Sequence, residues 1–221
     1  MKKMFIIIII LAIIFVGMVV YKNTAVGSKN NVSVNEVQEI EQYISGIYMW
    51  EEVTNEALPI FEDINNANDL WTWEVIKKNL EQYEISYEEI KQKSKEIFGE
   101  SFTKEFPKEG TSSFEYDEEI DKYFATEIIT DNKEDLFLLS NINKTSEGYI
   151  VDIIEYLEDY SEENNIKVVN FNNEEIGNIS ISENESKVQE IVKNNKERFS
   201  KKRVVLKKEN DKLVVQKVEK V

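Results

Sequence analysis

The sequence predicts an α+β protein, in which an N-terminal transmembrane helix precedes one domain of segregated helices and strands. Three observations predict this class. An unbroken apolar run covers residues 4–20. Apolar residues then recur at helical spacing through residues 33–106. From residue 112 onward, runs of β-branched and aromatic residues alternate with clusters of Asn, Asp, Ser and Gly, a pattern typical of an antiparallel sheet.

The apolar run at residues 4–20 decides on which side of a membrane the rest of the chain lies. Its 17 residues reach the short end of the roughly 17–25 that cross a bilayer as a helix. Lys2 and Lys3 precede the run, so the positive-inside rule places the N-terminus in the cytoplasm and the domain outside. We expect residues 1–22 to be a single-pass membrane anchor or uncleaved signal, and residues 23–32 to be a polar linker.

Cleavage of the apolar segment, followed by secretion, is the alternative. Ala25 and Gly27 form one pair of small residues spaced like a signal-peptidase site. The length and flanks of the run favour an uncleaved anchor in the cell membrane. The chain has no Cys, which excludes a lipoprotein anchor and disulfide bonds, so packing must stabilise the domain. Either fate leaves residues 33–221 as a single extracytoplasmic α+β domain.

The helical part, residues 33–106, begins with two predicted helices. Ser33 and Glu36 have the spacing of a capping box, and the apolar residues after them recur at helical spacing. The first helix is therefore expected over residues 34–58, before a proline interrupts it. The second is expected over residues 69–83, where Trp, Ile, Leu and Tyr side chains form one stripe.

The third predicted helix has the most complete set of signals. Ser86 and Glu89 form another capping box. Ile85 and Ile90 are spaced as a hydrophobic staple, and Gly99 stands where a C-terminal glycine cap belongs. We expect the three helices to pack together.

The strand-rich part, residues 112–221, is expected to form an antiparallel sheet with one further helix before a C-terminal hairpin. Its predicted strands cover residues 114–116, 123–129, 136–142, 149–157, 166–171 and 176–181. Ser182 and Glu185 have capping-box spacing and start the further helix. The closing hairpin pairs residues 204–206 with residues 213–218.

Charge is unevenly distributed along the chain. The whole sequence holds 27 Lys and Arg against 43 Asp and Glu, a formal net charge of −16. Residues 186–221 carry a net +7, whereas residues 4–185 carry −25. An acidic body repels nucleic acid, because binding a polyanion relies on Lys and Arg, so we expect no nucleic-acid partner. Two interpretations remain: a solvated surface with the basic segment lying against the acidic body, or steering towards a basic envelope protein or metal ion.

The sequence offers few groups for catalysis. It has no His and no Cys, so the commonest general base, the thiolate nucleophile and the usual zinc ligands are missing. Ser101 and Lys104 match an SxxK motif, but the elements at Lys144 and Ser182 that would accompany it follow in the wrong order for a penicillin-binding site. With 43 acidic residues, carboxylate pairs arise by chance. We therefore predict no catalytic, cofactor-binding or metal-binding residues.

Two further patterns favour structural roles. Asp63 begins a partial calcium-loop template that lacks the required glycine, so Asn68 or Asp69 is better explained as the N-cap of the second helix. Trp71 and Trp73 lie in the helical part, where such residues are typical of a core. Because they are two residues apart, they cannot face the same way on a helix.

Two resemblances follow from the order of these elements. Residues 85–106, ISYEEIKQKSKEIFGESFTKEF, with the strand-rich half and the closing VVLKKENDKLVVQKV, resemble small exported Gram-positive domains of the cell-wall DL-endopeptidase inhibitor type. That resemblance implies a non-catalytic protein that plugs a peptidoglycan hydrolase. Helices followed by a sheet and a basic hairpin are also similar to NTF2-like domains, which implies a binding or assembly module. Neither resemblance assigns a functional residue.

We therefore expect a membrane-anchored, extracytoplasmic binding domain that is not an enzyme. The most specific form of this hypothesis is that the domain modulates a cell-wall hydrolase. The frequent Ile, Lys, Asn and Glu indicate an AT-rich bacterial genome, and a Cys-free exported domain suits a Gram-positive envelope. Two alternatives stay open: a carboxylate-based envelope hydrolase and a structural subunit of an envelope complex.

Overall fold

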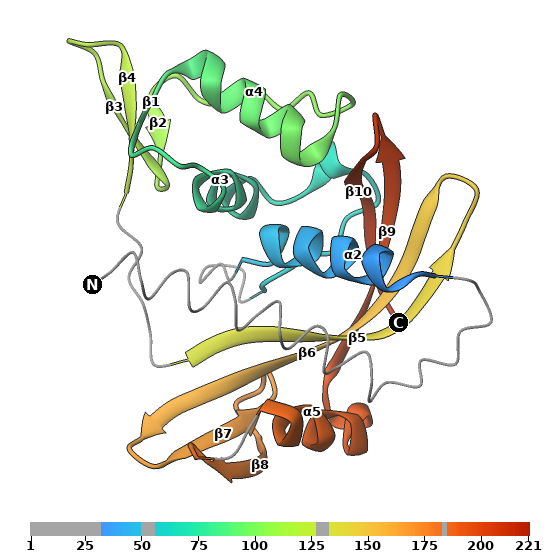
Figure 1. Cartoon of the computed structure of the whole chain (residues 1–221). Coiled ribbons are helices and arrows are strands. Elements are labelled where there is room, and N and C mark those ends of the chain that lie inside the picture. The colour runs from blue at the N-terminus through green and yellow to red at the C-terminus, as the bar shows by residue number, and fades with distance from the viewer. Residues whose placement is uncertain (1–31, 50–55, 127–132, 183–184) are drawn as a thin grey trace.

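The computed structural model describes residues 32–49, 56–126, 133–182 and 185–221 (Figure 1). These residues form four α-helices and two antiparallel sheets, which confirms the predicted α+β class. The helices are α2 (Val34–Ile47), α3 (Asp69–Lys78), α4 (Tyr87–Phe98) and α5 (Glu185–Asn194), with the 3-10 turns η1 (Ile64–Asn66) and η2 (Lys196–Arg198). The strands are β1 (Glu84–Ile85), β2 (Gly110–Thr111), β3 (Phe114–Asp117), β4 (Lys122–Ala125), β5 (Lys133–Lys144), β6 (Gly148–Glu162), β7 (Asn165–Val169), β8 (Glu175–Ser180), β9 (Ser200–Glu209) and β10 (Lys212–Lys220).

The predicted membrane anchor falls outside this description. Residues 1–31, which contain the apolar run at 4–20, are not among the described residues. Among the residues that are described, no helix is long and apolar enough to cross a membrane. The anchor and its orientation therefore stay predictions.

The large sheet has six strands and is organised around the long strand β6. On one edge of β6, β5 pairs antiparallel along most of its length, from Lys133 opposite Asp159 to Lys144 opposite Tyr149. On the other edge, β9 pairs with the first half of β6 and β7 pairs with the second half. Strands β10 and β8 extend these two halves, which gives the order β10-β9-β6-β7-β8.

Each half of the large sheet has its own helices and its own core (Figure 1). Helices α2, α3 and α4 lie in a stack on the side of β9 and β10, and their apolar residues form the larger core with those strands and β6. Helix α5 covers β7 and β8 instead, and its Val188 and Val192 are buried in a smaller core. The further helix before the hairpin is thus present where the sequence predicts it.

Helix α3 is buried on more than one side, which resolves the placement of its two tryptophans. Trp71 packs between Phe61 and Phe98, with ring centroids 5.8 Å from each. Trp73 meets Phe106 edge-on at 5.0 Å. The two indoles therefore point to different neighbours, and both are buried because α3 has packed elements around it.

The first two helices are shorter than predicted. Helix α2 ends at Ile47, because Tyr48 takes an extended conformation and its hydroxyl donates to Leu136 O at 3.2 Å. Residues 50–55 lie outside the described chain, and the buried Leu58 that follows is not helical. The expectation of a helix to residue 58 is therefore wrong.

Helix α3 ends at Lys78, so the prediction of a helix to residue 83 is also wrong. Asn79 terminates it, because the Asn79 side-chain amide donates to the carbonyls of Gly46 and Val75, both at 2.8 Å. Tyr83, expected on the buried stripe, is 62% exposed.

The caps of α2 and α4 are confirmed. In both helices the N-cap serine accepts from the N3 backbone amide, and the N3 glutamate accepts from the serine backbone. Gly99 ends α4 with a φ of +92°, a conformation that favours glycine. A Cβ at this position would also lie 2.8 Å from the Glu209 carboxylate of the C-terminal hairpin. Gly99 thus both ends α4 and permits close packing against β9.

The basic C-terminal hairpin, β9–β10, lies against acidic residues of other elements. Ion pairs of 2.7–3.5 Å join Lys202 to Glu155, Arg203 to Asp152, Lys208 to Glu39, Lys212 to Glu96 and Lys217 to Glu62. Basic side chains of this hairpin therefore pair with carboxylates of the same domain. The sequence as a whole still has an excess of carboxylates, with 43 Asp and Glu against 27 Lys and Arg.

Glu36 joins the start of α2 to the large sheet. Its Oε1 accepts from Lys144 Nζ at 2.6 Å and from the Tyr149 hydroxyl at 2.7 Å, while Oε2 accepts from the backbone and hydroxyl of Ser33. These donors, Lys144 above all, hold the pKa of Glu36 well below its usual range.

We expect Glu36→Gln to lower the free energy of unfolding by about 1 kcal/mol at pH 7, because four donors then lose a charged acceptor. The lowered pKa stabilises the fold above the pKa of unfolded glutamate, about 4.3, and this contribution is lost as pH falls through the folded value. Urea unfolding at pH 7 and pH 3 should therefore show a difference from wild type that shrinks at pH 3. An equal difference at both pH values would contradict the role of the charge.

Candidate functional site

The β3–β4 hairpin is the part of the fold that projects furthest as a separate feature (Figure 1). The end of β3 and the turn after it are strongly acidic: Glu115, Asp117, Glu118, Glu119 and Asp121 lie within seven positions. All of them are exposed or half-buried. Ile120 lies among them and is 52% exposed, so this tip also carries an accessible apolar side chain. We call residues 115–121 the acidic hairpin tip.

The acidic hairpin tip has a defined local conformation. Asp117 Oδ1 accepts from the Glu119 backbone amide at 2.9 Å, which closes the start of the turn. Asp121 ends the turn with a φ of +55°, and its carboxylate accepts from the Tyr116 hydroxyl at 2.9 Å. The bonded carboxylates shape the loop, so Glu118, Glu119 and Ile120 are left to face outward at its end.

The base of the hairpin is fixed by aromatic packing. Tyr123 on β4 contacts Tyr116 across the hairpin at 4.8 Å between ring centroids, and Phe106 edge-on at 5.0 Å. Phe106 also meets Phe114 on β3 at 5.4 Å. Tyr87 at the start of α4 lies 6.5 Å from Tyr123. The base of the hairpin therefore packs in an aromatic cluster, whose rings come from β3, β4, the start of α4 and the segment after α4.

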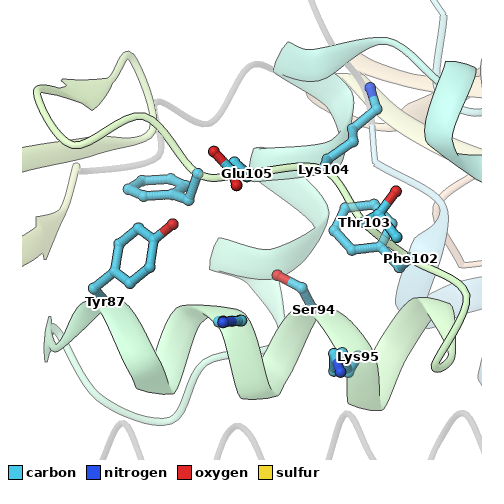
Figure 2. A pocket seen from close by; sticks show the side chains of 9 residues that line it. Tyr87, Ser94, Lys95, Phe102, Thr103, Lys104 and Glu105 are labelled. Carbon is cyan, nitrogen blue, oxygen red and sulfur yellow. The ribbon is translucent and has the colours of Figure 1, made fainter.

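A pocket of about 140 Å³ lies beside this cluster, between α4 and the extended residues 102–106 (Figure 2). Its walls are built from Tyr87, Lys91, Ser94, Lys95, Phe102, Thr103, Lys104, Glu105 and Phe106. Figure 2 shows Tyr87, Ser94 and Lys95 on α4, which runs alongside a segment that carries Phe102 to Glu105; Tyr87 and Ser94 point toward this segment. The pocket thus shares Tyr87 and Phe106 with the base of the hairpin.

Hydrogen bonds on the far side of residues 102–106 hold this segment away from α4. Thr103 donates to Asn65 Oδ1 through its backbone amide at 2.7 Å and through its hydroxyl at 3.1 Å. Lys104 points away from α4 in Figure 2, and its ammonium binds the Ala67 carbonyl and the Asp69 carboxylate at the start of α3. These bonds of Thr103 and Lys104 hold the segment from the side opposite α4, and they do not cross the pocket.

The lining of the pocket is mixed in charge. Lys91 and Lys95 are one helical turn apart and so lie on the same face of α4. Lys91 forms no ion pair with another described residue, and Lys95 forms only an exposed pair with Glu100 at 3.2 Å. Glu105 supplies the single carboxylate of the lining and likewise has no ion pair in the described chain.

The motif matches in the sequence do not assemble into one site. Lys104 of the SxxK match binds at the start of α3, whereas Lys144 binds Glu36 at the start of α2. Ser101 contributes its backbone carbonyl, which accepts from Asn65 at 3.0 Å. The third element includes residues 183–184, which are outside the described chain.

The calcium-loop residues act as caps and ties. Asn68 accepts from Trp71 N at 3.1 Å, which confirms Asn68 as the N-cap of α3. Asp63 caps η1 by accepting from Asn65 N at 2.8 Å, and Asp69 pairs with Lys104. No group of three acidic side chains within the described ranges has a geometry that could hold a metal ion.

A buried ion pair between β6 and β9 lies away from the pocket, beside Tyr48 and Leu58. Glu155 is 1% exposed and accepts from Lys202 at 3.2 Å, from Ser200 at 2.9 Å and from the Tyr48 hydroxyl at 3.3 Å. Lys202, 5% exposed, also donates to the Leu58 carbonyl. Burial raises the pKa of Glu155, and the Lys202 ammonium opposes that rise. Each polar atom of this cluster is engaged within the fold, so we assign it a structural role.

The sequence analysis named Lys104 in the SxxK match, but it did not predict the pocket that Lys104 helps to line. The only signal was the run KQKSK within α4, which places Lys91 and Lys95 four residues apart on a polar helix face. Glu105 and Phe106 follow in a segment without regular structure, and no local pattern shows that this segment returns alongside α4. The acidic hairpin tip is visible as the string EYDEEID, but its projection is not.

Comparison of the chain with protein-family models, with curated proteins and with solved structures finds no match in any of the three. The resemblances to hydrolase-inhibitor and NTF2-like domains therefore stay predictions.

Proposed function

We propose that this protein is a membrane-anchored, extracytoplasmic binding domain without enzymatic activity, and that its acidic hairpin tip contacts a basic protein of the cell envelope. A peptidoglycan hydrolase whose activity is modulated by this contact is the most specific version. The observation that carries the proposal is the projecting β3–β4 hairpin, which combines exposed carboxylates with an exposed Ile120 (Figure 1).

Charge supports a basic partner. The chain carries a formal net charge of −16, and basic side chains of the C-terminal hairpin are already paired with the domain itself. The resulting negative field accelerates encounter with a cationic surface. Exposed carboxylates alone contribute little affinity, whereas an apolar side chain that becomes buried at the centre of a contact contributes more. Ile120 provides such a side chain at the end of the hairpin.

Shape favours a binder over the alternative of a carboxylate-based hydrolase. A glycoside hydrolase of that kind needs two carboxyl groups facing each other across the substrate. The pocket beside α4 offers only Glu105, and its 140 Å³ is small beside the roughly 300–1,000 Å³ of substrate-sized sites. The other alternative, a structural subunit, would depend on residues 4–20, which lie outside the described chain.

The test is capture by the full-length chain, held in mild detergent and immobilised through a C-terminal tag. A Gram-positive envelope extract is passed over it at about 50 mM and about 150 mM salt, and captured proteins are identified by mass spectrometry. We expect a basic protein whose capture weakens as salt rises. The variant Glu118→Gln/Glu119→Gln/Ile120→Ser should then reduce capture about tenfold.

The matched control changes two other exposed acids, Glu175→Gln on β8 and Glu190→Gln on α5, which lie at the opposite end of the fold (Figure 1). Like the tip variant, the control removes two negative charges, but it should keep capture within about twofold of the wild type. Equal losses in both variants would show a nonspecific effect of charge. Capture of no protein at either salt would contradict the proposal.

A further inference from the structure

We propose that the pocket between α4 and residues 102–106 is a binding site for a free α-amino acid. Lys91 and Lys95 hold the carboxylate, Glu105 holds the ammonium group, and the rings of Tyr87, Phe102 and Phe106 contact the apolar side chain (Figure 2). This inference goes beyond the proposed contact of the hairpin and does not depend on it, because no protein partner is involved.

The positive side of the site is formed by two lysines on one face of α4. Residues four apart on a helix are neighbours, so their ammonium groups can bind the two oxygens of one carboxylate. Lys91 has no ion-pair partner among the described residues. Lys95 pairs with Glu100, but those side chains are 41% and 70% exposed, so little free energy is lost when a ligand replaces Glu100.

The negative side of the site is Glu105, on the segment opposite α4. Its carboxylate is exposed and forms no ion pair with another described residue, so an ammonium group can reach it without displacing a partner. Lys104, the neighbouring cation, points away from α4 and is occupied by Asp69 and the Ala67 carbonyl. The lining thus offers separate places for a ligand carboxylate and a ligand ammonium.

Aromatic rings form the apolar part of the lining. Phe102 and Phe106 are 4% and 5% exposed, and both are fixed by neighbouring rings, Phe102 by Phe98 and Phe106 by Tyr123. Rigid rings do not collapse into the pocket, and they can contact an aliphatic side chain or lie near an ammonium group. The site is therefore preorganised on its apolar side.

Size and net charge both favour an amino acid over larger or singly charged ligands. A pocket of 140 Å³ is comparable to the engineered cavity of about 150 Å³ that admits benzene, so it suits a group of about six to ten heavy atoms. A purely anionic ligand is repelled by a chain of net charge −16, and a purely cationic one meets the pocket lysines. A zwitterion has no net charge and satisfies both sides.

Equilibrium dialysis of the full-length chain in detergent tests the site with valine, leucine and isoleucine. We expect at least one of them to bind with a dissociation constant on the order of 0.1–1 mM, as befits so small a ligand. The N-acetyl derivative and the amide of that amino acid each remove one charge and should bind about ten- to a hundredfold more weakly. Failure of all three amino acids to bind at about 10 mM, or equal binding of the derivatives, would overturn the proposal.

Variants place the binding in this pocket. Lys91→Gln and Glu105→Gln change exposed side chains without ion-pair partners in the described chain, so they should leave the fold intact and weaken binding about tenfold. The matched control is Lys93→Gln, on the same helix but outside the pocket lining, where Lys93 pairs with Glu96. It should leave binding unchanged. If Lys93→Gln weakens binding as much as Lys91→Gln, the pocket is not the site.

Discussion

Replacing Lys202 with methionine is expected to lower the free energy of unfolding by about 3–5 kcal/mol, because Glu155 would be left buried without its cation. Glu155 is 1% exposed, and the Leu58 carbonyl would lose a donor as well. The double variant Lys202→Met/Glu155→Leu should recover most of the loss, since apolar residues often replace a buried ion pair at little cost. Lys201→Met, which breaks a surface pair with Glu197, should cost less than about 0.5 kcal/mol.

The loss in Lys202→Met should also depend on pH. Lys202 holds down a pKa of Glu155 that burial raises, so its removal raises the folded pKa further above the unfolded value of about 4.3. A raised carboxyl pKa makes stability fall as pH rises between the unfolded and the folded values. Urea unfolding followed by tryptophan fluorescence should therefore show a larger loss at pH 7 than at pH 4.5. A double variant as unstable as Lys202→Met would contradict this assignment.

Trp71→Ala should lower the free energy of unfolding by about 3–5 kcal/mol, because it leaves a cavity at the centre of the larger core. Trp71 is fully buried between Phe61 and Phe98, and its indole N–H donates to the Ala57 carbonyl at 3.1 Å. The same hydrogen bond ties α3 to Ala57, which precedes α3 in the chain. Thermal unfolding monitored by circular dichroism measures the loss.

Two companion variants separate the contributions of Trp71. Trp71→Phe keeps most of the ring but leaves the Ala57 carbonyl without this donor, so we expect a loss of about 1–3 kcal/mol. Tyr83→Ala removes a ring that is 62% exposed and should change stability by less than about 0.5 kcal/mol. If Trp71→Ala were as mild as Tyr83→Ala, the burial of α3 would be wrongly assigned.

The sequence predicted the elements of this fold well where neighbouring residues both supply the pattern and make the bonds that form the element. The capping boxes at Ser33 and Ser86 and the glycine at Gly99 act through bonds within one turn, so they can be read from neighbouring residues. The ends of α2 and α3 could not be predicted from neighbouring residues. They are set by Tyr48 and Asn79, whose side chains bond to residues far along the chain.

The arrangement of the sheets was less predictable than their strands. Alternating runs showed that most strands exist, but not that β6 is long enough to pair with β9 on one half and β7 on the other. The division of the large sheet into two halves, each with its own core, follows from that pairing. The pocket depends on the same long-range placement, because the segment that carries Glu105 is held beside α4 by bonds from Thr103 to Asn65 and from Lys104 to Asp69.

The proposed function requires that the domain lie outside the cell, and the absence of Cys allows a direct measurement. Tyr83→Cys introduces a single thiol at an exposed position, and Lys3→Cys introduces one on the expected cytoplasmic side of residues 4–20. Intact cells producing each variant are treated with a membrane-impermeant maleimide. We predict labelling of the Tyr83→Cys protein in intact cells, in the membrane fraction, and labelling of the Lys3→Cys protein only after lysis. Labelling of the Tyr83→Cys protein only after lysis would place the domain in the cytoplasm and contradict an envelope function.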